Sequence, residues 1–356
     1  MTLPKINSYT NWGRLEEVWL GDCYPAHFYD HLESEVRDVF YAITEKTQED
    51  LAVIHRRLEE FGVVVRRPYY ENIDRYIERY NPARQGQLCK PIICPRDIFL
   101  VYGNTLYGSR WDFEPWRTAV DEYTQDSQCQ ILERVNYPGA LFVNGANTVR
   151  AGRDIYLDSH YDGGEKTLEN QQYQQLIQTM FKDYRIHQLH NGGHVDGCFA
   201  VLKPGLLLTS KYFSDYDRTF PGWGKININE PEFLRHKTSW RTGPGNNGKW
   251  HVPGVSNSAK FNNHVIKHAQ DWVGDYTETY FEVNCLVIDE KNVLMLGENE
   301  GVFRELERHG ITAHSLPFRT RTFWDGGLHC ITLDIRRNDS MIDLFPERGG
   351  QELFVY

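Results

Sequence analysis

Short apolar runs of strand length alternate with stretches of helical periodicity along most of this chain. Apolar residues at helical spacing predict a helix over residues 47–61, which a strand-like run at 63–65 follows. A second helix is predicted over 167–182 by the same spacing. Two hairpins are predicted at 199–209 and 286–296, where turn residues separate two apolar runs. This alternation is typical of an α/β protein built from several similar strand–helix units.

The length of the chain leaves two domain organisations open. Its 356 residues exceed the roughly 250–300 residues at which a single simple core stops growing. Either two domains or one large domain built from repeated units would account for this length. Residues 211–275 form the exception to the alternation, because they are polar, aromatic and rich in glycine and proline. We interpret this segment as a lid or wall of a binding site, with plain surface decoration as the alternative.

Composition excludes several classes of function. A net charge of −10 disfavours nucleic-acid binding, which depends on basic surface. No run of eighteen apolar residues is present, so no membrane span is expected, and the first residues lack the apolar core of a secretory signal. The seven cysteines contain no C-x-x-C pair, which favours reduced thiols in a cytoplasmic protein. Without a phosphate-binding loop or dinucleotide fingerprint, we expect no cofactor.

Cys330 is the candidate nucleophile. It follows Gly326, Gly327 and His329 and stands directly before a predicted strand. Glycines let a backbone approach a ligand closely, and a thiol becomes a strong nucleophile when a nearby base helps it lose its proton. The alternative is a small buried side chain, which is what most cysteines are.

His194 and Asp196 are candidates for the base and for a supporting carboxylate. In extended geometry, residues two apart point to the same face, so one pocket could hold both side chains. The alternative is a histidine bonded to a backbone carbonyl, with Asp196 in a turn.

Asp97 places a further carboxylate at the start of the strand predicted at 98–102. A surface cap or a salt bridge is the ordinary explanation, and internal ion pairing is the ordinary explanation for Arg150 and Asp154. His194, Asp196, His329 and Cys330 have the right atoms for a metal site. They lack the close spacing of known metal motifs, so we expect no metal.

Taken together, these runs resemble the amidinotransferases of the guanidine-modifying (pentein) superfamily. The resemblance covers nearly the whole chain and rests on six ordered runs: residues 9–18, 95–97, 149–155, 183–187 with 194–196, 284–291, and 327–330 with 334–337.

This resemblance implies a pentein-type α/β propeller with five blades. Residues 1–356 would form a single domain of ββαβ-like modules around a pseudo-fivefold axis, with the site in the central channel. The loop-rich segment at about 211–275 would be an insertion in that domain.

For the site, the resemblance implies that Cys330 attacks the guanidinium carbon of an arginine-like donor while His194 shuttles protons. Asp97 and Asp196 match the acids that bind the planar guanidinium, and such a cation suits bidentate carboxylates. The partners implied are small molecules, an arginine-like donor and an amine acceptor, and a homodimer is plausible by the same resemblance.

The sequence departs from the family pattern at Asn144 and Asn147. The family carries an acid at both positions, and its first acid supports the histidine. An amide can hydrogen-bond an imidazole but cannot stabilise its charged form; in a serine protease, the same exchange lowers turnover by about 10⁴. The serine pair of the family's acceptor site corresponds to Thr277 and Glu278. A further family arginine has no clear partner here, since Lys211 is nearby but does not align with it. Glycine is therefore a doubtful acceptor.

Three classes of function stay open. The first is transfer of an amidino group from an arginine-like donor to an amine. In the second, water replaces the amine and the protein is a deiminase or dihydrolase, which fits asparagines at 144 and 147. The third is a non-catalytic descendant that binds guanidino compounds or a protein partner.

Overall fold

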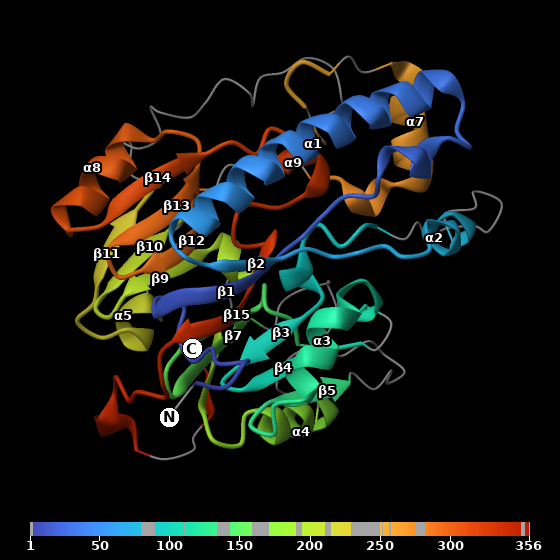
Figure 1. Ribbon diagram of the computed structural model, residues 1–356. Helices are drawn as coiled ribbons and strands as arrows, with labels where there is room; N and C mark the ends of the chain where they lie inside the picture. Colours follow the sequence, from blue (N-terminus) through green and yellow to red (C-terminus); the bar gives the residue numbers. More distant parts are fainter. Residues whose placement is uncertain are drawn as a thin grey trace.

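Five small sheets share one topology, in which the second strand pairs antiparallel with the first and parallel with the third (Figure 1). A helix connects the second and third strands of each module. The modules are β15 (Thr332–Asn338), β1 (Arg14–Leu20), α1 (Ser34–Glu60) and β2 (Val64–Arg66); β3 (Leu100–Tyr102), β4 (Thr105–Gly108), α3 (Arg117–Thr124) and β5 (Gln130–Glu133); β6 (Thr148–Ala151), β7 (Asp154–Asp158), α4 (Gln171–Met180) and β8 (Arg185–Leu189), with β16 (Leu353–Val355) added at the edge; β9 (Phe199–Lys203), β10 (Leu206–Thr209), α5 (Asp215–Thr219) and β11 (Gly224–Asn227); and β12 (Leu286–Asp289), β13 (Asn292–Leu296), α8 (Glu300–Arg308) and β14 (Thr312–Leu316).

The computed structural model describes residues 3–79, 90–109, 112–133, 143–158, 171–189, 194–210, 215–228, 250, 252–255, 258–274, 282–349 and 353–355. The other helices lie between these elements or within modules: η1 (Ala26–Tyr29), α2 (Ile73–Arg79), η2 (Pro95–Asp97), η3 (Glu114–Trp116), η4 (Val195–Gly197), α7 (Ala259–His268), η6 (Gln270–Trp272), α9 (Arg321–Trp324) and η7 (Pro346–Arg348). Within these residues, no helix is both long enough and apolar enough to cross a bilayer.

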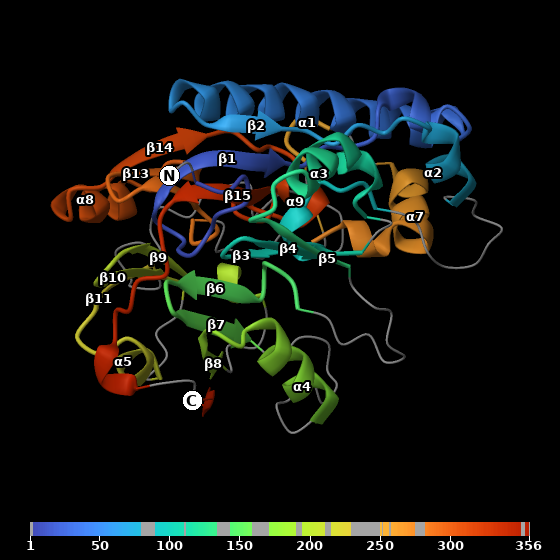
Figure 2. The same cartoon turned by 60° about the horizontal axis from the view of Figure 1, so that its bottom comes forward.

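The modules follow one another around a central axis, with helices α1, α8, α5 and α4 on the periphery (Figure 2). First strands of neighbouring modules contact each other in the interior, as β15 does with β3 and β6 with β9. The chain closes this ring because β15, near its end, pairs antiparallel with β1, near its start. The turns before the first strands therefore lie near the axis.

Helix α1 anchors the segment before β15 from outside the ring. Its buried face includes Phe40, Ile43 and Leu51, which belong to the largest core cluster. From the same face, Thr47 Oγ1 accepts a hydrogen bond from Trp324 Nε1 (2.8 Å). Trp324 ends α9, six residues before Cys330, so the position of this segment depends on helix packing as well as on the sheet.

The predicted alternation of strands and helices is confirmed, and both hairpins form, as β9–β10 and β12–β13. Helix α1 begins at Ser34 rather than at residue 47. Part of segment 211–275 is regular, because α5, β11 and α7 lie within it. The apolar pattern of the sequence did not predict β11, because a strand of four residues with a single polar–apolar alternation is too short to show a strand-like period. Residues 211–214, 229–249, 251, 256–257 and 275 of that segment lie outside the described residues, so its interpretation as a lid or wall stays a prediction.

Candidate active site

The turns before the five first strands are hydrogen-bonded to one another in a closed ring. Four of these turns carry predicted site residues, and the turn before β12 carries Asn284. The bonds run from Arg96 N to Cys330 O (3.4 Å), from His329 N to Asn284 O (3.2 Å), from Asn284 Nδ2 to Asp196 O (3.3 Å), from Asp196 N to Ala146 O (3.2 Å) and from Ala146 N to Arg96 O (3.1 Å). Residues far apart in sequence are thereby fixed around one point, where side chains from every module meet.

The Cys330 sulfur lies between an amide and a carboxylate. Asn284 Nδ2 donates to Sγ at 3.0 Å, and Sγ donates to Asp196 Oδ2 at 3.5 Å. Burial raises the pKa of the Cys330 thiol well above its ordinary value, and the nearby Asp196 and Asp97 carboxylates raise it further. The resting Cys330 side chain is therefore a thiol. The negative electrostatic field of the two carboxylates must be offset before this thiol can ionise.

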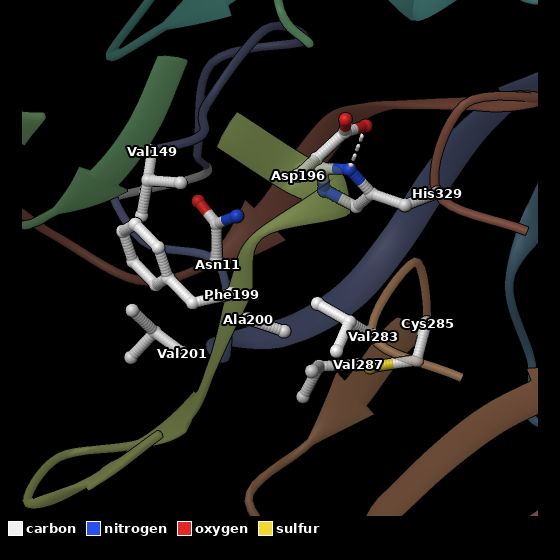
Figure 3. A pocket seen from close by; sticks show the side chains of 10 residues that line it. All are labelled: Asn11, Val149, Asp196, Phe199, Ala200, Val201, Val283, Cys285, Val287 and His329. Carbon is white, nitrogen blue, oxygen red and sulfur yellow. Dashed lines mark hydrogen bonds and ion pairs between the residues drawn. The ribbon is translucent and has the colours of Figure 1, made fainter. Parts of the chain in front are cut away.

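One carboxylate oxygen of Asp196 is hydrogen-bonded, and the other is not. His329 Nδ1 lies 2.9 Å from Asp196 Oδ2, while Oδ1 is buried and has no hydrogen-bond partner among the described residues (Figure 3). Burial acts to raise the Asp196 pKa, but the hydrogen bond from His329 and nearby positive charges outweigh it and lower the pKa. Burial lowers the pKa of His329 to about 4, so a neutral His329 donates to an ionised Asp196 near pH 7.

Asp97 and His194 form the more open side of the site. His194 Nδ1 lies 4.0 Å from Asp97 Oδ1, and each side chain keeps 26% of its surface exposed, whereas Cys330 is only 6% exposed. Enclosure raises the pKa of Asp97 to about 6, although His194 counteracts the shift. The site thus deepens from Asp97 and His194 at the rim to Cys330 and Asp196 at the base.

Asn144 and Asn147 form the turn before β6. Asn144 Oδ1 accepts a hydrogen bond from the Asn147 backbone N–H (2.9 Å), and Asn144 O accepts one from Thr148 Oγ1 (2.7 Å). Asn147 Oδ1 is buried without a hydrogen-bond partner among the described residues. The side-chain oxygen of Asn144 is thus used within its own turn, and support of His194 by Asn144 stays a prediction.

The prediction of extended geometry at 194–196 is wrong. Val195–Gly197 form the 3₁₀ turn η4, which the Gly197 N–H to His194 O bond (3.0 Å) and the Cys198 N–H to Val195 O bond (3.0 Å) close. The strand starts only at Phe199, because the chain must turn from the axis into β9. The prediction for Asp97 needs the same correction, since residues 95–97 form η2 and β3 starts at Leu100.

The two glycines before His329 make room for side chains. A Cβ on Gly326 would lie 2.6 Å from Cys94 Sγ, and a Cβ on Gly327 would lie 2.6 Å from Asn284 Oδ1. Close approach of the backbone to a ligand, the role predicted for them, is therefore not needed to explain these glycines.

A small cavity lies behind Asp196 and His329 (Figure 3). Asn11 and apolar side chains from β9 and β12, such as Phe199 and Val287, line its other walls. Its volume of about 10 Å³ suits at most one water molecule. The cavity is too small for a guanidino compound.

Within the described residues, no group of three or more histidine, cysteine, aspartate or glutamate side chains is arranged to hold a metal ion. His329 Nδ1 instead faces the Asp196 carboxylate.

Comparison with known proteins identifies the relatives of this chain. No protein-family model matches it. Inosamine-phosphate amidinotransferase 1 of Streptomyces glaucescens is 24% identical over 382 residues, which cover 94% of this chain and 98% of the relative. Mitochondrial glycine amidinotransferase of Xenopus laevis is 23% identical, over 96% of this chain and 85% of the relative. The chain is thus similar over nearly its whole length to amidinotransferases.

A solved amidinotransferase structure has the same fold. SxtG from Microseira wollei, an amidinotransferase of the saxitoxin biosynthetic pathway, matches with a TM-score of 0.67 at 21% identity, over 96% of this chain and 100% of that chain. The five modules and this match confirm the pentein-type α/β fold that the resemblance implies.

Sequence reasoning missed two parts of this candidate site: the amide of Asn284 and the pairing of His329 with Asp196. The sequence did offer one signal for Asn284, its place in the chain. It stands just before the first strand of its module, as Asp97 and Asp196 do in theirs. Thr277, Glu278 and Lys211, which concern the acceptor, lie outside the described residues.

Proposed function

We propose that this protein is an amidinotransferase that moves an amidino group from an arginine-like donor to an amine through a covalent amidino-Cys330 intermediate. Similarity to amidinotransferases over nearly the whole chain supports the reaction class. The geometry of the site supports the residues: a thiol faces one carboxylate directly, and a second carboxylate, Asp97, contributes to the field that it senses.

The proposal depends most on one observation, the hydrogen bonds made by the backbone N–H groups next to the nucleophile. In acyl-transfer enzymes, backbone N–H groups of this kind stabilise an oxyanion. Here the N–H groups of His329 and Cys330 both donate to Asn284 Oδ1 at 3.0 Å. With those donors occupied and two carboxylates nearby, the site favours a cationic reacting group such as guanidinium.

Binding of the donor prepares the thiol for attack. The Asp97 and Asp196 carboxylates bind the guanidinium through Oδ1 of each, which accepts no hydrogen bond from the described residues. The cation offsets the negative field that holds the Cys330 proton, so the thiol can transfer this proton to His194.

The reaction then proceeds in two halves. Sulfur attacks the guanidinium carbon, the bond to the donor nitrogen breaks, and His194 returns its proton to the leaving amine, which is ornithine if the donor is arginine. An acceptor amine next attacks the same carbon and gives a proton to His194. The carbon–sulfur bond breaks, and the proton restores the Cys330 thiol.

Product analysis with arginine tests the proposal. Transfer predicts ornithine together with a new guanidine, formed only when an acceptor amine is present. Ammonia released without any acceptor would instead establish a hydrolase, and no turnover with any amine tested would favour a binding protein. Glycine and inosamine phosphate, the acceptors in the names of the relatives, are the first amines to test.

Donor affinity should depend on pH through Asp97. Its pKa of about 6 means that the carboxylate is ionised above pH 6 and protonated below it. We expect the KM for arginine to rise about tenfold per pH unit below pH 6, because a neutral carboxyl cannot pair with guanidinium. Steady-state kinetics between pH 5 and 8 measure this. The Asp97→Asn variant should have a high KM at every pH; a KM for the unaltered protein that stays flat across pH 6 would contradict the role of Asp97.

Restoring the family acid should raise turnover. In Asn144→Asp, a carboxylate oxygen can still accept the hydrogen bond from the Asn147 backbone N–H, and its charge can stabilise protonated His194. We expect at least a several-fold higher kcat for transfer from arginine. A kcat that is unchanged or lower would mean that Asn144 serves a different reaction.

A further inference from the structure

We infer that Asn284 is a positioning residue for the nucleophile: its amide fixes the loop that carries Cys330 and stabilises the thiolate that attacks the donor. The inference rests on the proposed function, because it assigns Asn284 to the same reaction.

The Asn284 amide is almost fully buried, at 5% exposed, and every polar hydrogen on it has an acceptor. Oδ1 accepts from the N–H groups of His329 and Cys330, and Nδ2 donates to Cys330 Sγ and to Asp196 O. The opposite orientation of the amide would turn its NH₂ group toward two N–H donors and its oxygen toward a carbonyl oxygen. The surroundings therefore determine which atom faces the sulfur.

The hydrogen bond to sulfur opposes the field of the carboxylates. Asp196 Oδ2 lies 3.5 Å from the sulfur, and a negative neighbour disfavours a thiolate. A donor favours the charged form of the group that it contacts. Asn284 Nδ2 supplies such a donor from a neutral side chain, whereas a lysine or arginine at this place would repel a guanidinium substrate. An amide thus helps ionisation of the thiol without weakening donor binding.

Gly327 makes the close approach of this amide possible. A Cβ at position 327 would lie 2.6 Å from Asn284 Oδ1, 2.7 Å from its Cβ and 2.8 Å from its Cγ. Real side chains do not tolerate contacts this short, so any larger residue would push the amide away from the loop. Gly327 and Asn284 are therefore expected to act as a pair.

The rate at which iodoacetamide alkylates Cys330, followed across pH by peptide mass spectrometry, tests the inference. Asn284→Ala removes the donor without adding a charge, and Gly327→Ala displaces the amide without altering it. In both variants, we expect the midpoint of the pH profile to rise by about one unit, with about tenfold slower alkylation below the midpoint.

Asn299→Ala is the matched control. Asn299 is also buried, in the same module, but its side chain caps α8 by accepting from Val302 N. Its loss should lower stability and leave the alkylation profile of Cys330 unchanged.

The outcomes separate this inference from the proposed function, because alkylation requires no guanidino donor. If Asn284→Ala and Gly327→Ala both keep the midpoint of the unaltered protein, the inference is overturned. If Asn284→Ala does not fold, as judged by circular dichroism, Gly327→Ala decides. If the midpoints shift but the unaltered protein never forms an amidino adduct, Asn284 still stabilises the thiolate and the proposed reaction is wrong.

Discussion

Replacing Cys330 by alanine is expected to abolish amidino transfer, with a loss in kcat of about 10⁴ or more. Alanine keeps the Cβ and adds no bulk next to Gly326, so the ring of turns should stay intact. What disappears is the only atom that the mechanism uses to accept the amidino group. Under the proposed mechanism, the remaining site would still bind the donor between Asp97 and Asp196 but would have no covalent route to product.

Formation of ornithine from arginine in the presence of an acceptor amine measures this loss. Cys129→Ala serves as the control, because the Cys129 thiol accepts a hydrogen bond from the Ile6 N–H (3.2 Å) away from the ring of turns. That variant should keep its activity. If Cys330→Ala turned over within about tenfold of the unaltered protein, the nucleophile would have to be another group.

The second large effect is expected on stability, from Asp334→Ala. Asp334 is fully buried, and its carboxylate accepts hydrogen bonds from Arg96, Arg150 and Arg337. Arg96 also donates to His329 O at 2.8 Å, so this ion cluster lies directly behind the loop of the nucleophile. Internal ion pairing, predicted for Arg150, is confirmed.

Loss of the Asp334 carboxylate would leave three buried guanidinium groups without their shared counter-charge. Breaking one buried ion pair costs about 3–5 kcal/mol, so we expect the free energy of unfolding to fall by about 4 kcal/mol or more. Urea denaturation measures it. Asp217, whose carboxylate pairs with Lys225 at 2.7 Å and is 60% exposed, offers a control, because a surface pair contributes about 1 kcal/mol or less. Equal losses in Asp334→Ala and Asp217→Ala would show that the cluster does not stabilise the fold.

The same cluster has a predictable dependence on pH. Burial acts to raise the Asp334 pKa, but Arg150, Arg96 and Arg337 outweigh it and hold the pKa well below its ordinary 3.8. A carboxyl with a lowered pKa stabilises the fold above its unfolded-state pKa, and this contribution is lost as the pH falls toward the folded-state pKa. The unaltered protein should therefore lose stability below about pH 4, and Asp334→Ala should lose less of it over that interval.

The repeated strand–helix units could be predicted because their signals are local. Pro204 and Gly205 mark one hairpin turn, and both strands beside them are continuous apolar runs. The early start of α1 could also have been found, because Val36, Phe40 and Ile43 follow helical spacing and are buried. Five-module closure has no such local signal, since it depends on pairing β15 with β1 across nearly the whole chain.

The candidate site was predictable only in part, because its geometry also depends on contacts between distant parts of the chain. Resemblance pointed to Asp97, Asp196 and Cys330, and chemistry explains why a guanidinium site needs such groups. The geometry depends on hydrogen bonds between turns from different modules, so a short extended stretch at 194–196 was the wrong expectation. Asn284 carries no charge, and although it begins the run 284–291 that resembles the family, no role at the site followed from that run; its contacts reveal the role.

Mass spectrometry of the intact protein incubated with arginine, without an acceptor amine, tests the central claim most directly. The account predicts that one amidino group is added, that peptide mapping places it on Cys330, and that an acceptor amine removes it. Steady formation of a guanidine product with no adduct on rapid quenching, or an adduct on any other cysteine, would contradict the account.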